Sequence, residues 1–211
     1  MLRVLIADDH ELVRIGVRKV IEGHTGWQVC GEAADGRESV DLARRERPDI
    51  AIIDVSLPVL NGLAVTRQIC QEVPGVAVLL LTMHEDHETI SGGLAAGARG
   101  YLLKLDAASH LEAAISALGA RKPYFSATVS EVLLDTMVNG GERSHLEHFT
   151  LRELEVGQLI AEGNSNKQIA RQIDRSIKTV ESHRAAAMRK AGVRTAAEFV
   201  RFAIKHNLIQ A

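Results

Sequence analysis

The sequence has few of the residues that mark specialised protein classes. Aromatic residues make up 3% of its 211 residues, and it has only two cysteines and four prolines. Cys30 and Cys70 lie in apolar segments without metal-ligand spacing, which favours reduced thiols over a disulfide. No apolar run approaches the roughly 20 residues that span a bilayer, and a predicted strand from Leu2 leaves no room for a signal peptide. We therefore expect a cytoplasmic, helix-rich protein with an aliphatic core.

Charge is distributed unevenly along the chain, although the formal net charge is only −2. Residues 1–123 carry 13 Lys and Arg against 17 Asp and Glu, whereas residues 145–211 carry 11 against seven. The first part is therefore acidic and the last part basic. A basic segment suits a polyanionic partner, although a solvated helical face would give the same composition.

Apolar runs alternate with helical patterns over residues 2–120. The runs predict five strands, at 2–7, 29–33, 50–54, 76–81 and 100–103. Apolar residues at helical spacing predict helices after each of them, at 11–21, 36–46, 62–72, 85–96 and 107–120. This alternation indicates a doubly wound α/β fold, in which helices cover both faces of a five-stranded parallel sheet.

The pattern changes at Pro123, after the last of these helices. We predict a connecting helix from Phe125 to Val138, followed by a glycine-containing linker at Asn139–Ser144. Only helical patterns follow, at 150–162, 166–172, 176–192 and 195–206. The predicted domains are therefore an α/β domain at 1–122, a connecting helix and linker at 123–145, and a small all-α domain at 146–211.

The stretch Ile50–Gly62 places Asp54 where a strand buried on both faces ends. Polar residues stand at the ends of three other predicted strands, namely Asp8 and Asp9, Thr82, and Lys104. A lone acid at a strand end is usually a cap, but the carboxyl ends of parallel strands meet at one edge of the sheet. Three carboxylates in one crevice repel one another unless a hard cation such as Mg²⁺ or Mn²⁺ shares their oxygens. With Lys104 and Thr82 available for phosphoryl oxygens, the cluster predicts an aspartyl-phosphate site.

Several of these positions together resemble the receiver domain of two-component response regulators, namely Asp8-Asp9, Asp54 with Pro58 and Gly62, Thr82, and Tyr101 three residues before Lys104. The resemblance implies a flavodoxin-like sheet of order 2-1-3-4-5 and a histidine kinase that phosphorylates Asp54. It implies that the metal is held by Asp8, Asp9, Asp54 and the Ser56 backbone carbonyl, and that the phosphate-binding and switch residues are Thr82, Tyr101 and Lys104. A receiver is a phosphoacceptor, so we expect no enzyme activity beyond self-phosphorylation and slow self-dephosphorylation.

Two positions depart from the receiver pattern. Leu57 stands where methionine is common, a substitution that conserves volume. Leu105 follows Lys104 where many receivers have proline, which keeps the lysine but leaves the geometry of that peptide bond open.

The basic tail has the layout of a helix-turn-helix. A short helix from Asn166 precedes a turn at Asp174–Arg175 and a longer basic helix capped by Ser176. With Thr150–Glu155 and Glu162–Gly163, these segments resemble a LuxR-type DNA-binding domain, and the whole chain resembles the NarL/FixJ family. The resemblance implies base-edge contacts from Glu181, Ser182 and Ala185, and phosphate contacts from Lys167, Lys178, Thr179, Arg184, Arg189 and Lys190.

Some positions depart from the LuxR pattern as well. Asp174 replaces the usual turn glycine, which aspartate tolerates because it enters the left-handed region more readily than most residues. Arg175 occupies a normally apolar position, which we expect Ile177 to compensate, and Ala187 and Ala191 replace larger apolar residues. We expect altered packing of the second helix, with DNA still the ligand.

The two resemblances imply a transcription regulator that is switched by phosphorylation and binds double-stranded DNA as a dimer. Two alternative interpretations remain. The first domain could serve only for dimerisation, although a site without function has no reason to keep the residues of all four strand ends. The chain could also be a phosphohydrolase acting through an aspartyl-phosphate, but Ser56 is not the general acid that this chemistry needs.

Overall fold

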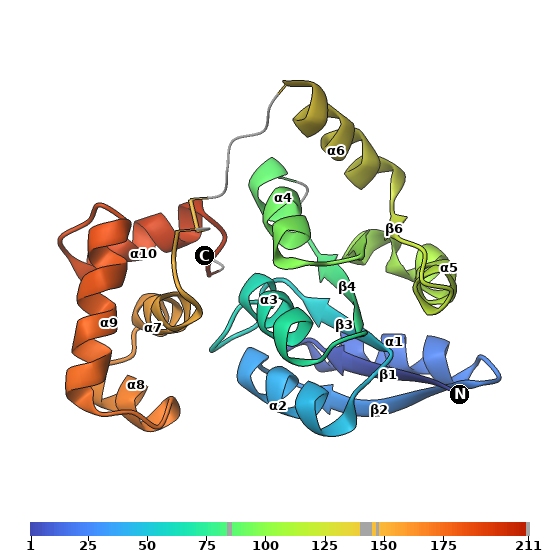
Figure 1. The fold of residues 1–211 in the computed structure, drawn as a ribbon, viewed down its shortest axis with the longest axis horizontal. Helices are drawn as coiled ribbons and strands as arrows, with labels where there is room; N and C mark the ends of the chain where they lie inside the picture. Colours follow the sequence, from blue (N-terminus) through green and yellow to red (C-terminus); the bar gives the residue numbers. More distant parts are fainter. Residues whose placement is uncertain (84–85, 140–144, 147, 210–211) are drawn as a thin grey trace.

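The structure, a computed structural model, describes residues 1–83, 86–139, 145–146 and 148–209. Its first part is a parallel sheet with helices on both faces, and its second part is helical (Figure 1). The strands are β1 (Leu2–Ala7), β2 (Trp27–Ala33), β3 (Ile50–Asp54), β4 (Ala77–Thr82), β5 (Gly100–Leu103) and β6 (Tyr124–Phe125). They lie in the order β2-β1-β3-β4-β5-β6, and neighbours are parallel. This confirms the doubly wound fold and the order 2-1-3-4-5, with one strand more than predicted.

The short strand β6 corrects the predicted start of the connecting helix. Tyr124 and Phe125 pair with Gly100 and Tyr101 of β5, and the helix α6 (Ala127–Asn139) begins two residues later than predicted. Aromatic residues favour strands, and β5 would otherwise end the sheet with unpaired backbone groups. Pairing at this edge therefore outweighs the helical pattern. Residues 140–144 of the predicted linker lie outside the described residues.

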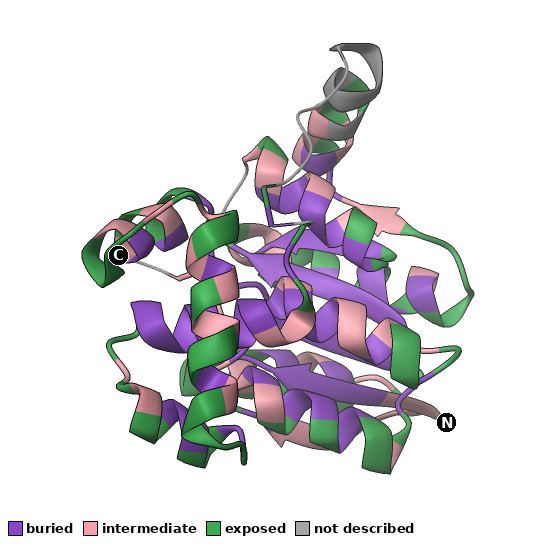
Figure 2. Cartoon of the chain, turned by 60° about the vertical axis from the view of Figure 1, so that its left-hand side comes forward, coloured by how far each residue is buried: buried purple, intermediate pink, exposed green. Residues whose placement is uncertain are grey.

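Helices cover both faces of the sheet. They are α1 (Glu11–Glu22), α2 (Gly36–Glu46), α3 (Gly62–Glu72), α4 (His87–Ala96) and α5 (Ala107–Gly119), with a 3₁₀ turn, η1 (Lys104–Asp106), before the last. Helix α1 packs beside α5 on one face, and α2, α3 and α4 pack in sequence on the other. Side chains of β3 alternate between these two layers, which explains its unbroken apolar run. In Figure 2 the central strands are buried and the outer helix faces are exposed.

The second part contains α7 (Leu151–Ala161), α8 (Asn166–Gln172), α9 (Ile177–Lys190) and α10 (Ala196–Lys205). Three of these helices begin with a reciprocal capping box, in which Thr150, Ser165 and Thr195 pair with the residue three positions on. Helix α7 packs against α8, α9 and α10. Asp174 has a φ of 50°, as expected for its turn. No helix among the described residues is long and apolar enough to span a membrane.

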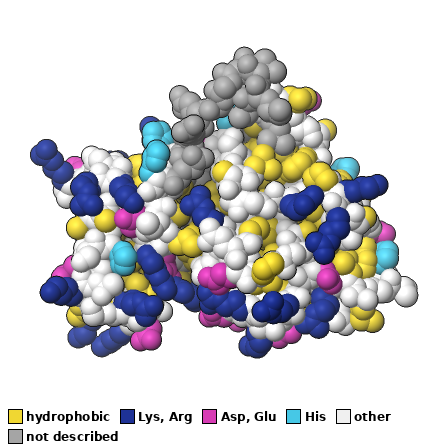
Figure 3. Space-filling view, in the orientation of Figure 1, with side chains coloured by type: hydrophobic (Ala, Val, Ile, Leu, Met, Phe, Trp, Pro, Cys, Tyr) yellow, Lys and Arg dark blue, Asp and Glu magenta, His cyan; other side chains and the backbone are white. Residues whose placement is uncertain are grey.

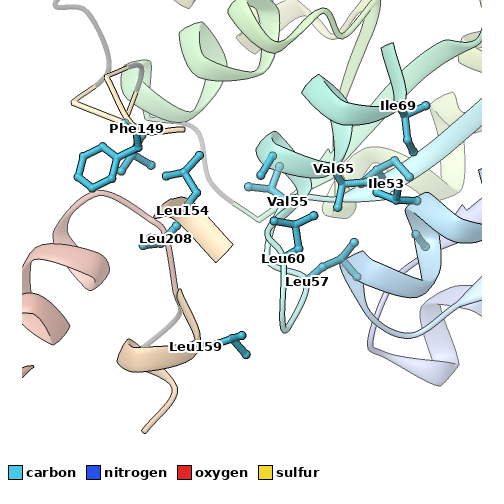
Figure 4. Packing of buried hydrophobic residues seen from close by; sticks show 14 of the residues in the cluster. Ile53, Val55, Leu57, Leu60, Val65, Ile69, Phe149, Leu154, Leu159 and Leu208 are labelled. Carbon is cyan, nitrogen blue, oxygen red and sulfur yellow. The ribbon is translucent and has the colours of Figure 1, made fainter. Parts of the chain in front are cut away.

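The two parts of the chain contact each other through α7 and the end of α10. Apolar side chains of both parts belong to one buried cluster, and Figure 4 shows Leu154 and Leu208 opposite Val55 and Leu60. At the end of α10, Asn207 Nδ2 lies 3.0 Å from Asp86 Oδ2 and 3.0 Å from Thr89 Oγ1 on α4. His206 Nδ1 lies 2.9 Å from Glu88 Oε2. The helical part is therefore docked on the loops and helices that follow β3 and β4.

Candidate functional site

The polar residues predicted at the strand ends lie together at one edge of the sheet. Parallel pairing in register sets Asp54 level with Leu81, and Thr82 level with Leu103. Asp8 and Asp54 are each 1% exposed, and Thr82 is fully buried. Such burial is unusual for acids without partners, so the arrangement indicates a site rather than a set of surface caps.

Lys104 is the cation that joins the two buried acids. Its Nζ lies 2.8 Å from Asp8 Oδ2 and 3.0 Å from Asp54 Oδ2. Burial raises the pKa of Asp54, and the positive charge of Lys104 opposes that rise, while the negative charge of Asp8 adds to it. Burial disfavours the charged form of Lys104, but Asp54 and Asp8 outweigh this effect and raise the pKa of the lysine. The site therefore concentrates negative charge that one ammonium group only partly balances.

The donor atoms of this cluster fit a divalent cation. One ligand atom each from Asp8, Asp9, His10 and Asp54 lies within 4.8 Å of the others. Asp9 is the exposed acid of the set, and its Oδ1 is 2.7 Å from His10 Nδ1. Buried carboxylate oxygens beside an exposed one suit a hard ion that keeps part of its water shell. His10 was not among the predicted residues, although its position directly after the acid pair is a signal for its place in the cluster.

Thr82 and Tyr101 lie side by side, as the resemblance to receivers implies. Tyr101 is fully buried. Burial raises the pKa of its hydroxyl, and a hydrogen bond with Thr82 opposes that shift. Gly93 of α4 leaves room for the ring, because a Cβ atom there would lie 3.2 Å from Tyr101 Cε2. The tyrosine ring therefore occupies an inward position between β4, β5 and α4.

The loop from Ser56 to Asn61 leads directly away from Asp54, and its backbone is unusual. Val59 has a φ of 69°, and Leu60 N donates to Pro58 O at 2.8 Å, which closes a γ-turn. Positive φ is a genuine outlier for a β-branched residue. The sequence offered no signal for this strain, because Val59 is not a residue type that favours the left-handed region. All peptide bonds of the described residues are trans, including Lys104–Leu105, whose geometry the sequence left open.

The residues predicted to contact DNA occupy α8 and α9. Lys167 lies on α8, and the outer face of α9 exposes Lys178, Glu181, Ser182, Ala185 and Arg189. In Figure 3, Lys and Arg side chains project from the outer side of the helical part. Ile177 is 46% exposed and Arg175 is also exposed, so Ile177 does not compensate for the arginine as expected.

Three of the predicted phosphate-contacting residues have partners within the helical part. Arg184 donates to Asn166 Oδ1 at 3.0 Å, and Thr179 Oγ1 lies 2.8 Å from Ser176 Oγ. Lys190 Nζ is 2.9 Å from the carbonyl oxygen of His148 and 2.5 Å from a carboxylate oxygen of Glu153. The contacts of Arg184 and Lys190 join α8 and α7 to α9, and the contact of Thr179 lies within the N-terminal cap of α9, so each of these side chains also has a structural role.

Comparisons with known proteins match both parts of the chain. Residues 4–116 match the response regulator receiver domain, and residues 147–203 match the luxR family of bacterial regulatory proteins. The transcriptional regulatory protein LiaR of Bacillus subtilis is 35% identical over 211 residues, which cover 99% of this chain and 100% of LiaR.

Solved structures of RcsB are similar over nearly the whole chain. RcsB from Salmonella enterica serovar Typhimurium, bound to promoter rprA in the presence of the phosphomimetic BeF3−, is 29% identical with a TM-score of 0.61. The match covers 95% of this chain and 97% of that chain. A structure of two RcsB dimers bound to two parallel DNAs is 29% identical with a TM-score of 0.59, covering 95% and 96% of the two chains.

Proposed function

Because this chain belongs to the NarL/FixJ response regulators, which join a receiver domain to a LuxR-type DNA-binding domain, we propose that phosphorylation of Asp54 controls its binding to promoter DNA. The observation that carries the proposal is the position of Lys104 Nζ between the buried carboxylates of Asp8 and Asp54. Buried acids held by one lysine, with the hydroxyl of Thr82 at the same edge, suit the binding of a phosphoryl group. We propose a receiver at 1–122, a connecting segment at 123–145 and the DNA-binding domain at 146–211.

In this proposal Asp54 is the nucleophile. An Oδ atom of Asp54 attacks the phosphorus of a phosphohistidine on a sensor kinase, forming the O–P bond as the donor P–N bond breaks. Lys104 and Thr82 would then bind phosphoryl oxygens, as a point charge and a hydrogen-bond donor. Mg²⁺ or Mn²⁺ would be held by Asp8, Asp9, Asp54 and the Ser56 carbonyl, and would neutralise charge on the transferred group. A kinase partner of this kind also places the protein in the cytoplasm.

Thr82 and Tyr101 are the proposed switch pair. A phosphoryl group adds a charge near −2 and strong acceptor oxygens beside Thr82. A hydroxyl that turns toward the phosphate changes its hydrogen bond with Tyr101, which packs against Gly93 of α4. The signal would therefore reach α4, which the end of α10 contacts through Asp86 and Thr89.

The DNA-binding domain is proposed to read DNA with α9. Glu181, Ser182 and Ala185 would face base edges, and exposed Lys167, Lys178 and Arg189 would contact phosphates. Arg184, Thr179 and Lys190 remain proposed phosphate contacts, although each would first have to leave or share its present partner. A dimer would place two such helices on half-sites about one helical turn apart.

The test compares wild type with Asp54→Ala in binding to fragments of promoter DNA, with and without a small phosphodonor and Mg²⁺. We expect tighter binding by the phosphorylated wild type and no response from the variant. Equal affinity of wild type and variant under both conditions would refute the switch. Release of phosphate from small phosphoesters, at rates well above self-dephosphorylation, would instead favour a phosphohydrolase.

A further inference from the structure

We propose that Gln158 and Glu162 of the DNA-binding part are positioning residues for the phosphoacceptor loop, residues 56–61. They hold this loop in a strained conformation, so that docking of α7 and phosphorylation of Asp54 oppose each other. The inference rests on the proposed role of Asp54. It adds a defined contact through which the second domain regulates the chemistry of the first.

The side-chain amide of Gln158 forms hydrogen bonds with the loop as a neighbouring backbone amide would. Its Nε2 donates to Leu57 O at 2.7 Å, and its Oε1 accepts from Asn61 N at 2.6 Å. The side chain is 2% exposed. Both ends of the loop are therefore tied to a single amide group, and a buried backbone donor and acceptor depend on it for their partners.

Glu162 holds the strained residue between those two points. Its Oε1 accepts from Val59 N at 3.1 Å and from Gln158 Nε2 at 2.9 Å. The free energy needed to hold a residue in this strained conformation is comparable to the contribution of a few hydrogen bonds. Such strain persists only where the surrounding contacts impose it. Glu162 caps the C-terminus of α7, one helical turn after Gln158, so both residues act on the loop from the same side of this helix.

An ion-pair group anchors α7 beside this contact. Glu155, which is 2% exposed, pairs with Arg37 of α2 and with Arg152, whose Nη1 is 2.6 Å away. All residues of α7 from Glu153 to Ala161 are buried. A helix buried on every side, with three polar residues among them, needs partners in both domains. The docked position is therefore well defined.

The clamp, formed by Gln158 and Glu162, lines the same cleft as Asp9 and Ser56, two of the proposed metal-binding residues. A cavity of about 410 Å³ is lined by Asp9, Ser56 and Pro58 on the receiver side and by Gln158 and Glu162 on the other. A phosphoryl group on Asp54 adds charge near −2 to this region, where the carboxylate of Glu162 already lies. Repulsion between like charges disfavours the docked state, which gives the coupling its direction.

Docking leaves the predicted DNA-reading face open. Lys178, Glu181 and Ser182 of α9 are exposed while α7 is docked. The receiver thus acts on the second domain at α7 and α10, away from these side chains. Because coupling between two equilibria is reciprocal, undocking of α7 favours phosphorylation of Asp54 at equilibrium by the same factor by which phosphorylation favours undocking.

The experiment measures the initial rate of Asp54 phosphorylation by acetyl phosphate and Mg²⁺ in the full-length chain. Gln158→Leu removes both loop contacts, and Glu162→Gln removes the charge while keeping an acceptor for Val59 N. The matched controls are Gln172→Leu and Glu112→Gln, exposed residues of α8 and α5. We expect the two clamp variants to react at least about fivefold faster, because docking lowers the population of chains whose loop is free to react by about that factor or more. The controls should match wild type.

Hydrogen exchange at the amides of Val59 and Asn61 reports the clamp directly, because these groups donate to Glu162 and Gln158. We expect exchange at both to quicken in phosphorylated wild type, and at Asn61 in unphosphorylated Gln158→Leu. Faster exchange at Asn61 without a faster reaction would overturn the inference, as would unchanged exchange after phosphorylation. If wild type gains no more phosphate than Asp54→Asn, the proposed function itself fails, and the inference with it.

Discussion

Replacing Gly62 by alanine tests how tightly the phosphoacceptor loop is seated. Gly62 is the first residue of α3, and its N donates to Val55 O at 2.8 Å. A Cβ atom there would lie 2.1 Å from Asp54 O, 2.7 Å from Val55 Cα and 2.8 Å from Asp54 C. All three atoms belong to the backbone, so no side-chain rotation can relieve the clash.

The size of the effect follows from these distances. Carbon contacts are optimal near 3.5–4.0 Å, so the backbone at Asp54 or at the start of α3 would have to move by roughly 1 Å. Overpacking of a closed interior costs about 1–3 kcal/mol, and we expect the upper end because backbone meets backbone. Gly16 is the matched control, since a Cβ there has no atom within 4 Å. Alanine at this exposed helical position should stabilise by about 0.5–1 kcal/mol.

The chain provides its own probe for the measurement. Trp27 is its single tryptophan and lies in β2, so its fluorescence reports unfolding of the receiver part even if the second domain unfolds separately. We expect Gly62→Ala to lower the receiver Tm by roughly 10 °C and Gly16→Ala to raise it slightly. Gly62→Ala should also slow phosphorylation, because it displaces Asp54. An unchanged Tm for Gly62→Ala, or the same shift in both variants, would refute the close approach on which this reasoning depends.

The remaining predictions concern the charge of the two domains. Burial raises the folded-state pKa of Asp54, so its contribution to stability is present below the unfolded pKa and is lost as the pH rises through the folded pKa. Without Mg²⁺, the Tm of Asp54→Asn relative to that of wild type should therefore increase as the pH rises from about 4. Addition of Mg²⁺ should raise the Tm of wild type more than that of the variant. In DNA binding, Lys178→Ala should reduce the slope of log K against log salt by about 1. Lys190→Ala should instead lower the Tm of the helical part, since Lys190 is bound to Glu153 and His148; a lowered slope with an unchanged Tm would reverse that assignment.

The acid site could be predicted from sequence because the sheet determines it. Once β1, β3, β4 and β5 are recognised as parallel neighbours, their last residues must lie at one edge of the sheet, independently of the conformation of the loops. The ion pairs of Lys104 with Asp8 and Asp54 follow from that placement, because the sequence puts a lysine directly after β5. His10 was missed because its contact with Asp9 depends on the path of the chain after β1, which strand order does not determine.

Other features depend on tertiary contacts that leave little trace in local sequence. The strand at Tyr124 and Phe125 forms because β5 offers an open edge, and helical spacing alone continues through those residues. The γ-turn at Val59 runs against the preference of its own residue type. Lys190 is basic and exposed, so sequence reasoning assigns it to DNA, whereas its contact with Glu153 comes from the crossing of α7 and α9.

The contact between α7 and the phosphoacceptor loop is the step that sequence reasoning left open, and its chemistry explains why. Gln158 and Glu162 are polar residues on a helix, a pattern that normally indicates a solvated face. Here they form hydrogen bonds with the backbone groups of Leu57, Val59 and Asn61. Backbone donors and acceptors of this kind are present in loops of nearly any sequence. A side chain that recognises backbone needs no complementary residue type on its partner, so no pairing signal appears in the sequence. The same feature makes the contact a direct sensor, because it responds to the path of the loop after Asp54 and not to the side chains the loop carries.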